Sequence, residues 1–371
     1  TATFDLGGLE PGTAYTYEVI LNGQTTSQGI DPDALRFETQ PLWQSRFDPP
    51  AFTMAVGSCS FINETKYDRP GKPYGGGYGI FEVIRSASPD FMLWAGNTAH
   101  LRRSDFTTRS GILKRFSRTR AIPGLSPLLA SIPHYATWSK ADFGFHDDGK
   151  YASQRALSEA AFKAFWPQPV EIPSLEGIPT RFRYADADFF LLDTRSYRDD
   201  TPDSRRLPEI LGKPQIEWLR QELMRSDATF KIILSGVPVL NPADNRENLS
   251  FAEAEHNALL EMLRRERISG LFILSGGKYY GELTKLVHAS NYNLYDLTVG
   301  PLTASPRTTK QELNYFRVPG TTTTERQFAI IRISGPEEDR QLQIQLTSME
   351  GDELWSRTIR AADLQPTKER M

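Results

Sequence analysis

The sequence predicts an α/β layer fold in which covered sheets form the core. Four short apolar runs, residues 52–57, 91–96, 230–236 and 271–276, each end in a small residue, as strands buried on both faces often do. Stretches with helical spacing lie between these runs, and this alternation indicates helices packed on sheets. The chain has 371 residues, of which 39% are hydrophobic, so it is long enough to bury a sizeable core.

Residues 1–40 predict the C-terminal part of an immunoglobulin-like β-domain. The run 15–21 is rich in β-branched and aromatic residues and is followed by Asn22-Gly23, a strong hairpin-turn signal. A second strand is expected at 35–38. Two strands alone are marginally stable, and the chain starts with threonine, so we expect the rest of this domain and any signal region to precede it. Residues 41–50 contain three prolines and predict a linker.

Three helices are predicted, at residues 153–166, 214–223 and 252–267. The second has a proline near its start, where the missing amide hydrogen costs little. Its apolar residues recur at the i, i+3 and i+7 spacing of one helix face. These apolar residues are Ile216, Leu219 and Leu223.

Further strands complete a domain that we place at residues 51–362. Residues 181–193 predict a long hairpin strand, and the runs 327–333 and 341–346 predict a late antiparallel pair. The remaining residues, 363–371, are expected to form a polar tail.

Composition and motifs exclude several classes of protein. The net charge of −3 gives no reason to expect a nucleic-acid partner. No apolar run approaches the roughly 18 residues of a membrane span. Cys59 is the single cysteine, so an internal disulfide is excluded. The glycine-rich run 75–79 lacks the Gly-Lys-Ser/Thr ending of a phosphate loop and instead predicts a turn at a helix start.

Polar residues follow the ends of the predicted strands, where ligands bind in α/β folds. A site for two metal ions needs several carboxylates and histidines, because hard cations take anionic or imidazole ligands at about 2 Å. The strand ends supply few such groups, namely Cys59, His100, Asp142 and Asp193.

Six segments resemble the PhoD-like alkaline phosphatase/phosphodiesterase family, and together they span most of the chain. Residues 52–59 resemble its Gly-Ser-Cys strand end, 91–102 its Leu-Gly-Asp-x-x-Tyr segment, 134–138 the lead-in to Trp-Asp-Asp-His-Asp, and 273–276 the lead-in to Gly-Asp-x-His; 67–75 and 177–184 are also similar. The resemblance implies a four-layer α-β-β-α metallophosphatase sandwich. It also implies a secreted or cell-envelope protein, periplasmic or on the cell surface.

The departures from the family pattern fall on its metal ligands. Asn97 stands where the family has a metal-binding aspartate, and His100 stands where it has a tyrosine ligand. Ser139, Lys140 and Ala141 replace an Asp-Asp-His run, with Asp142 retained, while Gly277 and Tyr279 replace an aspartate and a histidine. Of the usual iron ligands only Cys59 remains. The former active-site cleft therefore comprises Cys59, Asn97, His100, Arg102, Asp142, Gly277 and Tyr279.

These replacements predict a catalytically degenerate homologue. Asparagine offers a neutral oxygen in place of a carboxylate, glycine and alanine offer no ligand, and a lysine places a cation where a metal ion would lie. We expect a binding or structural subunit of the cell envelope, with a protein or glycan partner and no cofactor. The alternative is an active phosphomonoesterase or phosphodiesterase with a rebuilt site of Cys59, His100, Asp142 and His146, a donor set that favours zinc over iron or calcium.

A third hypothesis is a phosphate- or nucleotide-binding module without turnover. Residues 102–120 carry seven basic residues and one acidic residue, so Arg102 and Arg109 are candidates for binding an anion. The alternative interpretation of this stretch is a solvated helix face.

Overall fold

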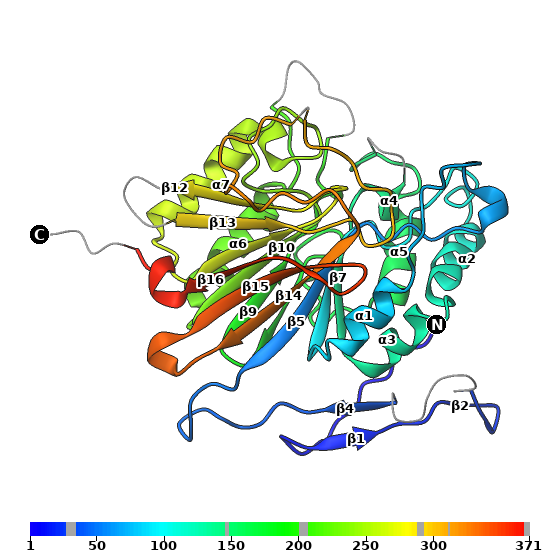
Figure 1. The fold of residues 1–371 in the computed structure, drawn as a ribbon, viewed down its shortest axis with the longest axis horizontal. Coiled ribbons are helices and arrows are strands. Elements are labelled where there is room, and N and C mark those ends of the chain that lie inside the picture. The colour runs from blue at the N-terminus through cyan, green and yellow to red at the C-terminus, as the bar shows by residue number, and fades with distance from the viewer. Residues whose placement is uncertain (27–34, 145–147, 200–206, 288–292, 311, 367–371) are drawn as a thin grey trace, which may run out of the picture.

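The computed structural model describes residues 1–26, 35–144, 148–199, 207–287, 293–310 and 312–366. Two six-stranded sheets pack face to face, and helices cover the outer face of each sheet (Figure 1). The molecule therefore has the four layers, helix, sheet, sheet and helix, that the resemblance implied.

The first sheet joins the early parallel strands to the end of the chain. Its strand order is β16-β15-β14-β5-β6-β7. The strands β5, β6 and β7 are parallel, whereas β14 pairs with β5 in antiparallel fashion and leads into the meander β14-β15-β16. The bounds are β5 (Phe52–Gly57), β6 (Phe91–Ala95), β7 (His134–Thr137), β14 (Gln327–Ser334), β15 (Gln341–Ser348) and β16 (Glu353–Arg360).

The second sheet has the order β12-β13-β11-β10-β9-β8. Its four central strands are parallel, and the two edge strands are antiparallel to their neighbours. The predicted hairpin at 181–193 corresponds to β8 and β9, whereas β12 and β13 were not predicted. The bounds are β8 (Thr180–Tyr184), β9 (Ala187–Leu191), β10 (Phe230–Ser235), β11 (Leu271–Ser275), β12 (Glu282–Val287) and β13 (Asn293–Thr298).

Alternation along the strands divides the apolar side chains among three cores. In β5, Met54 and Val56 face the core between the two sheets, while Ala55 faces the helices outside the first sheet. Helices α1 (Ile80–Ser86), α2 (Arg109–Arg120), α3 (Leu125–Ser131) and α5 (Arg155–Phe165) cover that first sheet. Helices α6 (Lys213–Arg225) and α7 (Glu253–Arg265) cover the second sheet.

Small β-sheets precede this sandwich. Strand β1 (Ala14–Thr16) pairs with β4 (Arg36–Glu38), and β2 (Ile20–Leu21) pairs with β3 (Gln24–Thr25). The continuous strand predicted at 15–21 is thus divided between β1 and β2. The hairpin turn at Asn22-Gly23 is confirmed, because both residues have the positive φ that this turn requires, 50° and 77°.

The end of the chain remains packed beyond the predicted domain limit. A 3-10 helix, Ala361–Leu364, buries Leu364 against the core between the sheets, so the first residues of the predicted polar tail belong to the fold. Within the described residues, the helices are all too short or too polar to cross a bilayer.

Candidate functional site

Glycines bring the strand ends of the two sheets into direct contact. A Cβ atom on Gly276 would lie 2.0 Å from the carbonyl oxygen of Ala95, and one on Gly236 would lie 2.0 Å from that of Trp138. Since no larger residue fits between these backbones, the loops after β10 and β11 lie against the loops after β6 and β7. The residues singled out from the sequence are therefore gathered around these contacts.

Cys59 is fully buried, and its thiol is enclosed by hydrogen bonds. The thiol donates to the carbonyl oxygen of Lys278 at 3.2 Å, and its sulfur accepts from the side-chain amide of Asn97 at 3.4 Å. Burial raises the pKa of the Cys59 thiol, although the hydrogen bonds from Asn97 and Ser58 oppose the shift. Burial thus favours the neutral thiol over the thiolate, which is the form that binds metal ions.

Asn97 extends this hydrogen-bond network through its side-chain oxygen. Its Oδ1 accepts from the backbone amide of Ala141 at 2.8 Å. Asn97 itself has a positive φ of 56°, a conformation that asparagine tolerates better than most residues. Asn97, which stands where the family has an aspartate, thus links the end of β6 to the segment after β7 through a hydrogen bond.

Asp142 is a buried helix cap. It belongs to the short helix α4 (Lys140–Phe143), and its Oδ2 accepts from the backbone amide of Ser139 at 3.1 Å in a capping box. Its Oδ1 accepts from the backbone amides of Thr98 and Ala99 at 2.6 and 2.8 Å and from the Thr98 hydroxyl at 2.9 Å. Burial raises the pKa of Asp142, while these hydrogen bonds favour the charged form. Both carboxylate oxygens are therefore engaged within the protein.

Gly277 occupies a position without room for a side chain. Its φ is 74°, in the left-handed region, and a Cβ atom would lie 2.3 Å from the carbonyl oxygen of Gly236. The backbone itself therefore fills the space next to the position where the resembling family carries a metal-binding aspartate.

Basic residues lie beside this loop. Together they line a hollow of about 390 Å³ that includes Lys140, Lys278 and Glu312. The buried ammonium of Lys278 pairs with both carboxylate oxygens of Glu312 at 3.0 and 3.1 Å. Glu247 in the same hollow pairs with Arg195; burial would raise the pKa of Glu247, but Arg195 and Lys140 bring it down to about 2. Glu247 and Glu312 are thus each paired with a side-chain cation.

His100 and Tyr279 line a second, adjacent hollow of about 470 Å³. The imidazole of His100 packs edge-on against the ring of Phe61, with 5.1 Å between ring centroids. The guanidinium of Arg307 lies over the ring of Tyr279 at 4.6 Å, and burial raises the pKa of that tyrosine. The surface around His100 is thus aromatic and basic. His146, the fourth residue of the predicted metal set, lies outside the described residues.

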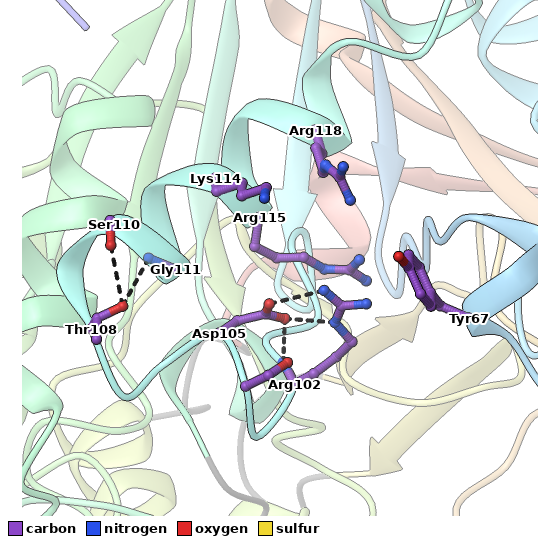
Figure 2. Close-up of a pocket in the computed structure, with 10 residues that line it drawn as sticks. Tyr67, Arg102, Asp105, Thr108, Ser110, Gly111, Lys114, Arg115 and Arg118 are labelled. Carbon is purple, nitrogen blue, oxygen red and sulfur yellow. Dashed lines mark hydrogen bonds and ion pairs between the residues drawn. The ribbon is translucent and has the colours of Figure 1, made fainter.

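Arg102 and Arg109 are placed differently. Arg102 forms a two-pronged ion pair with Asp105, at 2.7 and 2.9 Å, and lines a hollow of about 670 Å³ (Figure 2). Arg109 is the exposed first residue of α2 and does not line that hollow. Lys114, Arg115 and Arg118 also line the hollow but were not predicted, although the i, i+4 and i, i+3 spacing of Lys114 and Arg115 to Arg118 brings their side chains together on a helix.

The donor groups present do not fit a binuclear metal centre. Asp142 caps a helix, Cys59 donates its thiol hydrogen to a backbone carbonyl, Asn97 is neutral and Gly277 has no side chain. Within the described ranges, no group of three or more histidine, cysteine, aspartate or glutamate side chains is placed to hold a metal ion. No catalytic step through a metal follows from these residues. The set Cys59, His100, Asp142 and His146 stays a prediction, since His146 is not described.

Two facing mixed sheets with outer helices and a cluster of loops at their strand ends define a metallophosphatase-like sandwich. The family model for PhoD-like phosphatases matches residues 135–332, more than half of the chain. The chain belongs to this family, which confirms the resemblance in the sequence.

Individual relatives are distant. Alkaline phosphatase D of Bacillus subtilis (strain 168) is 22% identical over 307 residues, which are 72% of this chain and 51% of the relative, so the match spans about half of that protein. The structure of PhoD superposes with a TM-score of 0.67 at 16% identity, covering 91% of this chain and 74% of the other. The purple acid phosphatase PPD1 from yellow lupin (Lupinus luteus) gives 0.65 at 12% identity, covering 91% and 59%. These two structures are similar in fold.

Proposed function

We propose that this chain is a catalytically degenerate PhoD-like homologue that acts without a cofactor as a binding or structural subunit of the cell envelope, secreted to the periplasm or the cell surface. The observation that carries the proposal is the closed backbone at Gly277. Where the family sequence pattern has an aspartate, the carbonyl oxygen of Gly236 leaves no space for even a methyl group.

Other side chains at the strand ends are also engaged in hydrogen bonds within the protein. A metal ion at Asp142 would compete with the hydrogen bonds that this buried carboxylate accepts from three backbone amides and a hydroxyl. A buried donor that loses its partner costs about 1 to 3 kcal/mol. Cys59 would have to lose its proton and its bond to the Lys278 carbonyl. These costs oppose metal binding and support the loss of hydrolytic activity.

The charges support the same proposal. The ammonium groups of Lys140 and Lys278 lie in the hollow beside Gly277, and each would repel a divalent ion. Glu247 and Glu312 are already paired with arginine and lysine, so these two carboxylates need no metal ion to balance their charge.

The hollow around His100 is the surface that we assign to a protein or glycan partner. Its lining combines Tyr74 and Tyr279 with Arg69 and Arg307, and each arginine lies over a tyrosine ring, at 4.1 and 4.6 Å. Tyrosine and arginine are enriched in binding interfaces, because they offer a large apolar area together with hydrogen-bond donors.

The decisive experiment measures metal content by elemental mass spectrometry and turnover of p-nitrophenyl phosphate and bis-p-nitrophenyl phosphate on the same sample. Alkaline phosphatase D from Bacillus subtilis serves as the active control. We expect no stoichiometric metal and no turnover, also after addition of iron, calcium or zinc. Turnover near that of the control would overturn the proposal. Stoichiometric metal and turnover, both lost in His100→Ala, would establish the rebuilt phosphoesterase site instead.

A further inference from the structure

The hollow beside the start of α2 carries more positive than negative charge. It is lined by Arg102, Lys114, Arg115 and Arg118, with Asp105 as its carboxylate. Figure 2 shows the guanidinium groups of Arg102, Arg115 and Arg118 extending toward the same side, where Tyr67 lies. Asp105 forms two hydrogen bonds with Arg102 and is the single carboxylate among the lining residues, so four cations face one negative charge in this hollow.

Arg115 is the unusual member of this cluster, because its side chain is 4% exposed and has no carboxylate partner among the described residues. Its Nε donates to the carbonyl oxygens of Ala99 and His100 at 2.9 and 3.1 Å, and its Nη1 donates to Asn63 Oδ1 at 3.4 Å. Its Nη2 has no hydrogen-bond partner in the described part of the chain. Burial and then the like charge of Arg102 lower the pKa of Arg115 to about 10, so it remains a cation at neutral pH.

A buried cation whose donors are only partly used is costly unless an anion neutralises it. Neutral carbonyl oxygens hold the guanidinium of Arg115 in place but do not cancel its charge. Arg118 pairs with Glu64, while Lys114 is exposed and has no described carboxylate partner. The cluster therefore has donors and charge left over for a ligand.

We propose that this hollow binds the phosphate group of a phosphorylated small molecule. A phosphate dianion matches the cluster because arginine forks and a lysine ammonium donate to several oxygens of one tetrahedral group. The volume of about 670 Å³ exceeds the needs of inorganic phosphate and lies within the range of small-molecule sites, which leaves room for an organic part. Hydroxyl groups of Ser104, Ser110 and Tyr67 line the same space. The proposal holds whether or not the neighbouring cleft has turnover.

The test is isothermal titration calorimetry of the full chain at low ionic strength, with inorganic phosphate and glycerol 3-phosphate as probes. We expect both to bind, glycerol 3-phosphate more tightly. Lys114→Gln combined with Arg118→Gln, both at exposed positions, should weaken binding by about tenfold or more, since charge-assisted hydrogen bonds are lost. Arg109→Gln on the same helix, outside the hollow, is the matched control and should bind as the wild type does.

A variant that is expected to tighten binding distinguishes a specific phosphate site from non-specific attraction between charges. Glu64→Gln removes the carboxylate that competes for Arg118, so we expect tighter binding of glycerol 3-phosphate. Arg115→Lys keeps the charge but loses the fork and should weaken binding, with circular dichroism used to check that it is folded. No binding by the wild type would overturn the proposal. Equal losses in Arg109→Gln and the double variant would overturn it as well, because they indicate a non-specific charge effect.

Discussion

Asp142 holds Thr98 twice, through the backbone amide at 2.6 Å and through the hydroxyl at 2.9 Å. This pair links the helix after β7 to the loop after β6, at the point where the family pattern would converge on a metal ion. The one carboxylate retained from the Trp-Asp-Asp-His-Asp pattern therefore has a structural task here, and its removal should be felt in stability.

Asp142→Ala should destabilise the protein by about 3 to 5 kcal/mol, because it leaves three buried backbone amides without acceptors. Chemical denaturation followed by tryptophan fluorescence measures this change in the free energy of unfolding. The comparison is repeated with a chelator and with added zinc. A loss that appears only when metal is present would contradict the capping role and would identify Asp142 as a ligand.

Gly277→Ala should cost about 2 to 4 kcal/mol, because it combines a positive φ with a contact of 2.3 Å to a backbone oxygen. Gly79→Ala is the matched control, since Gly79 has a helical φ of −58° and no heavy atom within 4 Å of the added methyl group. The control should leave stability unchanged or raise it slightly. If Gly277→Ala melted at the wild-type temperature, the loop after β11 would have room for a ligand side chain.

Gly277→Asp restores the aspartate of the family pattern at a position without room for a side chain. Gly277→Asp should not restore metal binding, because the added carboxylate has no space and no partner ligands. Elemental analysis after incubation with iron, calcium or zinc checks this outcome, and stoichiometric uptake by the variant would refute it. The wild type treated in the same way is the control.

The fold was predictable where the strands are continuously apolar. Strands β5, β6, β10 and β11 were found within a residue of their observed ends. Strands β12 and β13 were missed because buried polar residues interrupt their apolar pattern. Glu282 in β12, for example, is buried because Arg317, Asn241 and Asn314 bind its carboxylate. These partners come from distant segments, so no local pattern reveals that such a residue lies in a core.

The site was predictable in its losses but not in its geometry. The replacement of metal ligands can be read directly from the amino-acid sequence. The lack of space at Gly277, in contrast, depends on the carbonyl of Gly236, some 40 positions away. In the same way, the basic stretch was visible, but Arg115 could not be separated from the exposed Arg109. Its burial results from contacts with the backbone of Ala99 and His100.

Cys59 should react with thiol reagents only when the protein unfolds. Its side chain is fully buried, its pKa is raised by burial, and it is the single cysteine of the chain, so labelling reports on one site. At pH 8 we expect slow reaction with 5,5′-dithiobis(2-nitrobenzoic acid) in buffer and rapid, stoichiometric reaction in denaturant. Rapid labelling of the native protein would show that the loop after β5 opens or that the thiol is ionised.

Asp296 should make stability fall as the pH rises from about 4 to about 6. Burial raises its pKa to about 6, although hydrogen bonds from Ser275 and from the amides of Leu240 and Val239 partly oppose this shift. The unfolded chain releases this proton near pH 4 and the folded chain only near pH 6, so the folded state binds more protons in between. Stability from this group is therefore full below pH 4, falls between the two values, and is lower by about 2 to 3 kcal/mol above them.

Asp296→Asn removes this ionisation but keeps a carbonyl oxygen that can accept from the amides of Leu240 and Val239. Thermal unfolding of the wild type and the variant is measured between pH 4 and 7. The difference between their free energies of unfolding should change by about 2 to 3 kcal/mol over this range, and the variant should become more stable relative to the wild type as the pH rises. Asp5→Asn, on the exposed N-terminal segment, is the control and should run parallel to the wild type. A constant difference between Asp296→Asn and the wild type across this range would mean that Asp296 is charged throughout, stabilised by the two amides and the Ser275 hydroxyl against the cost of burial.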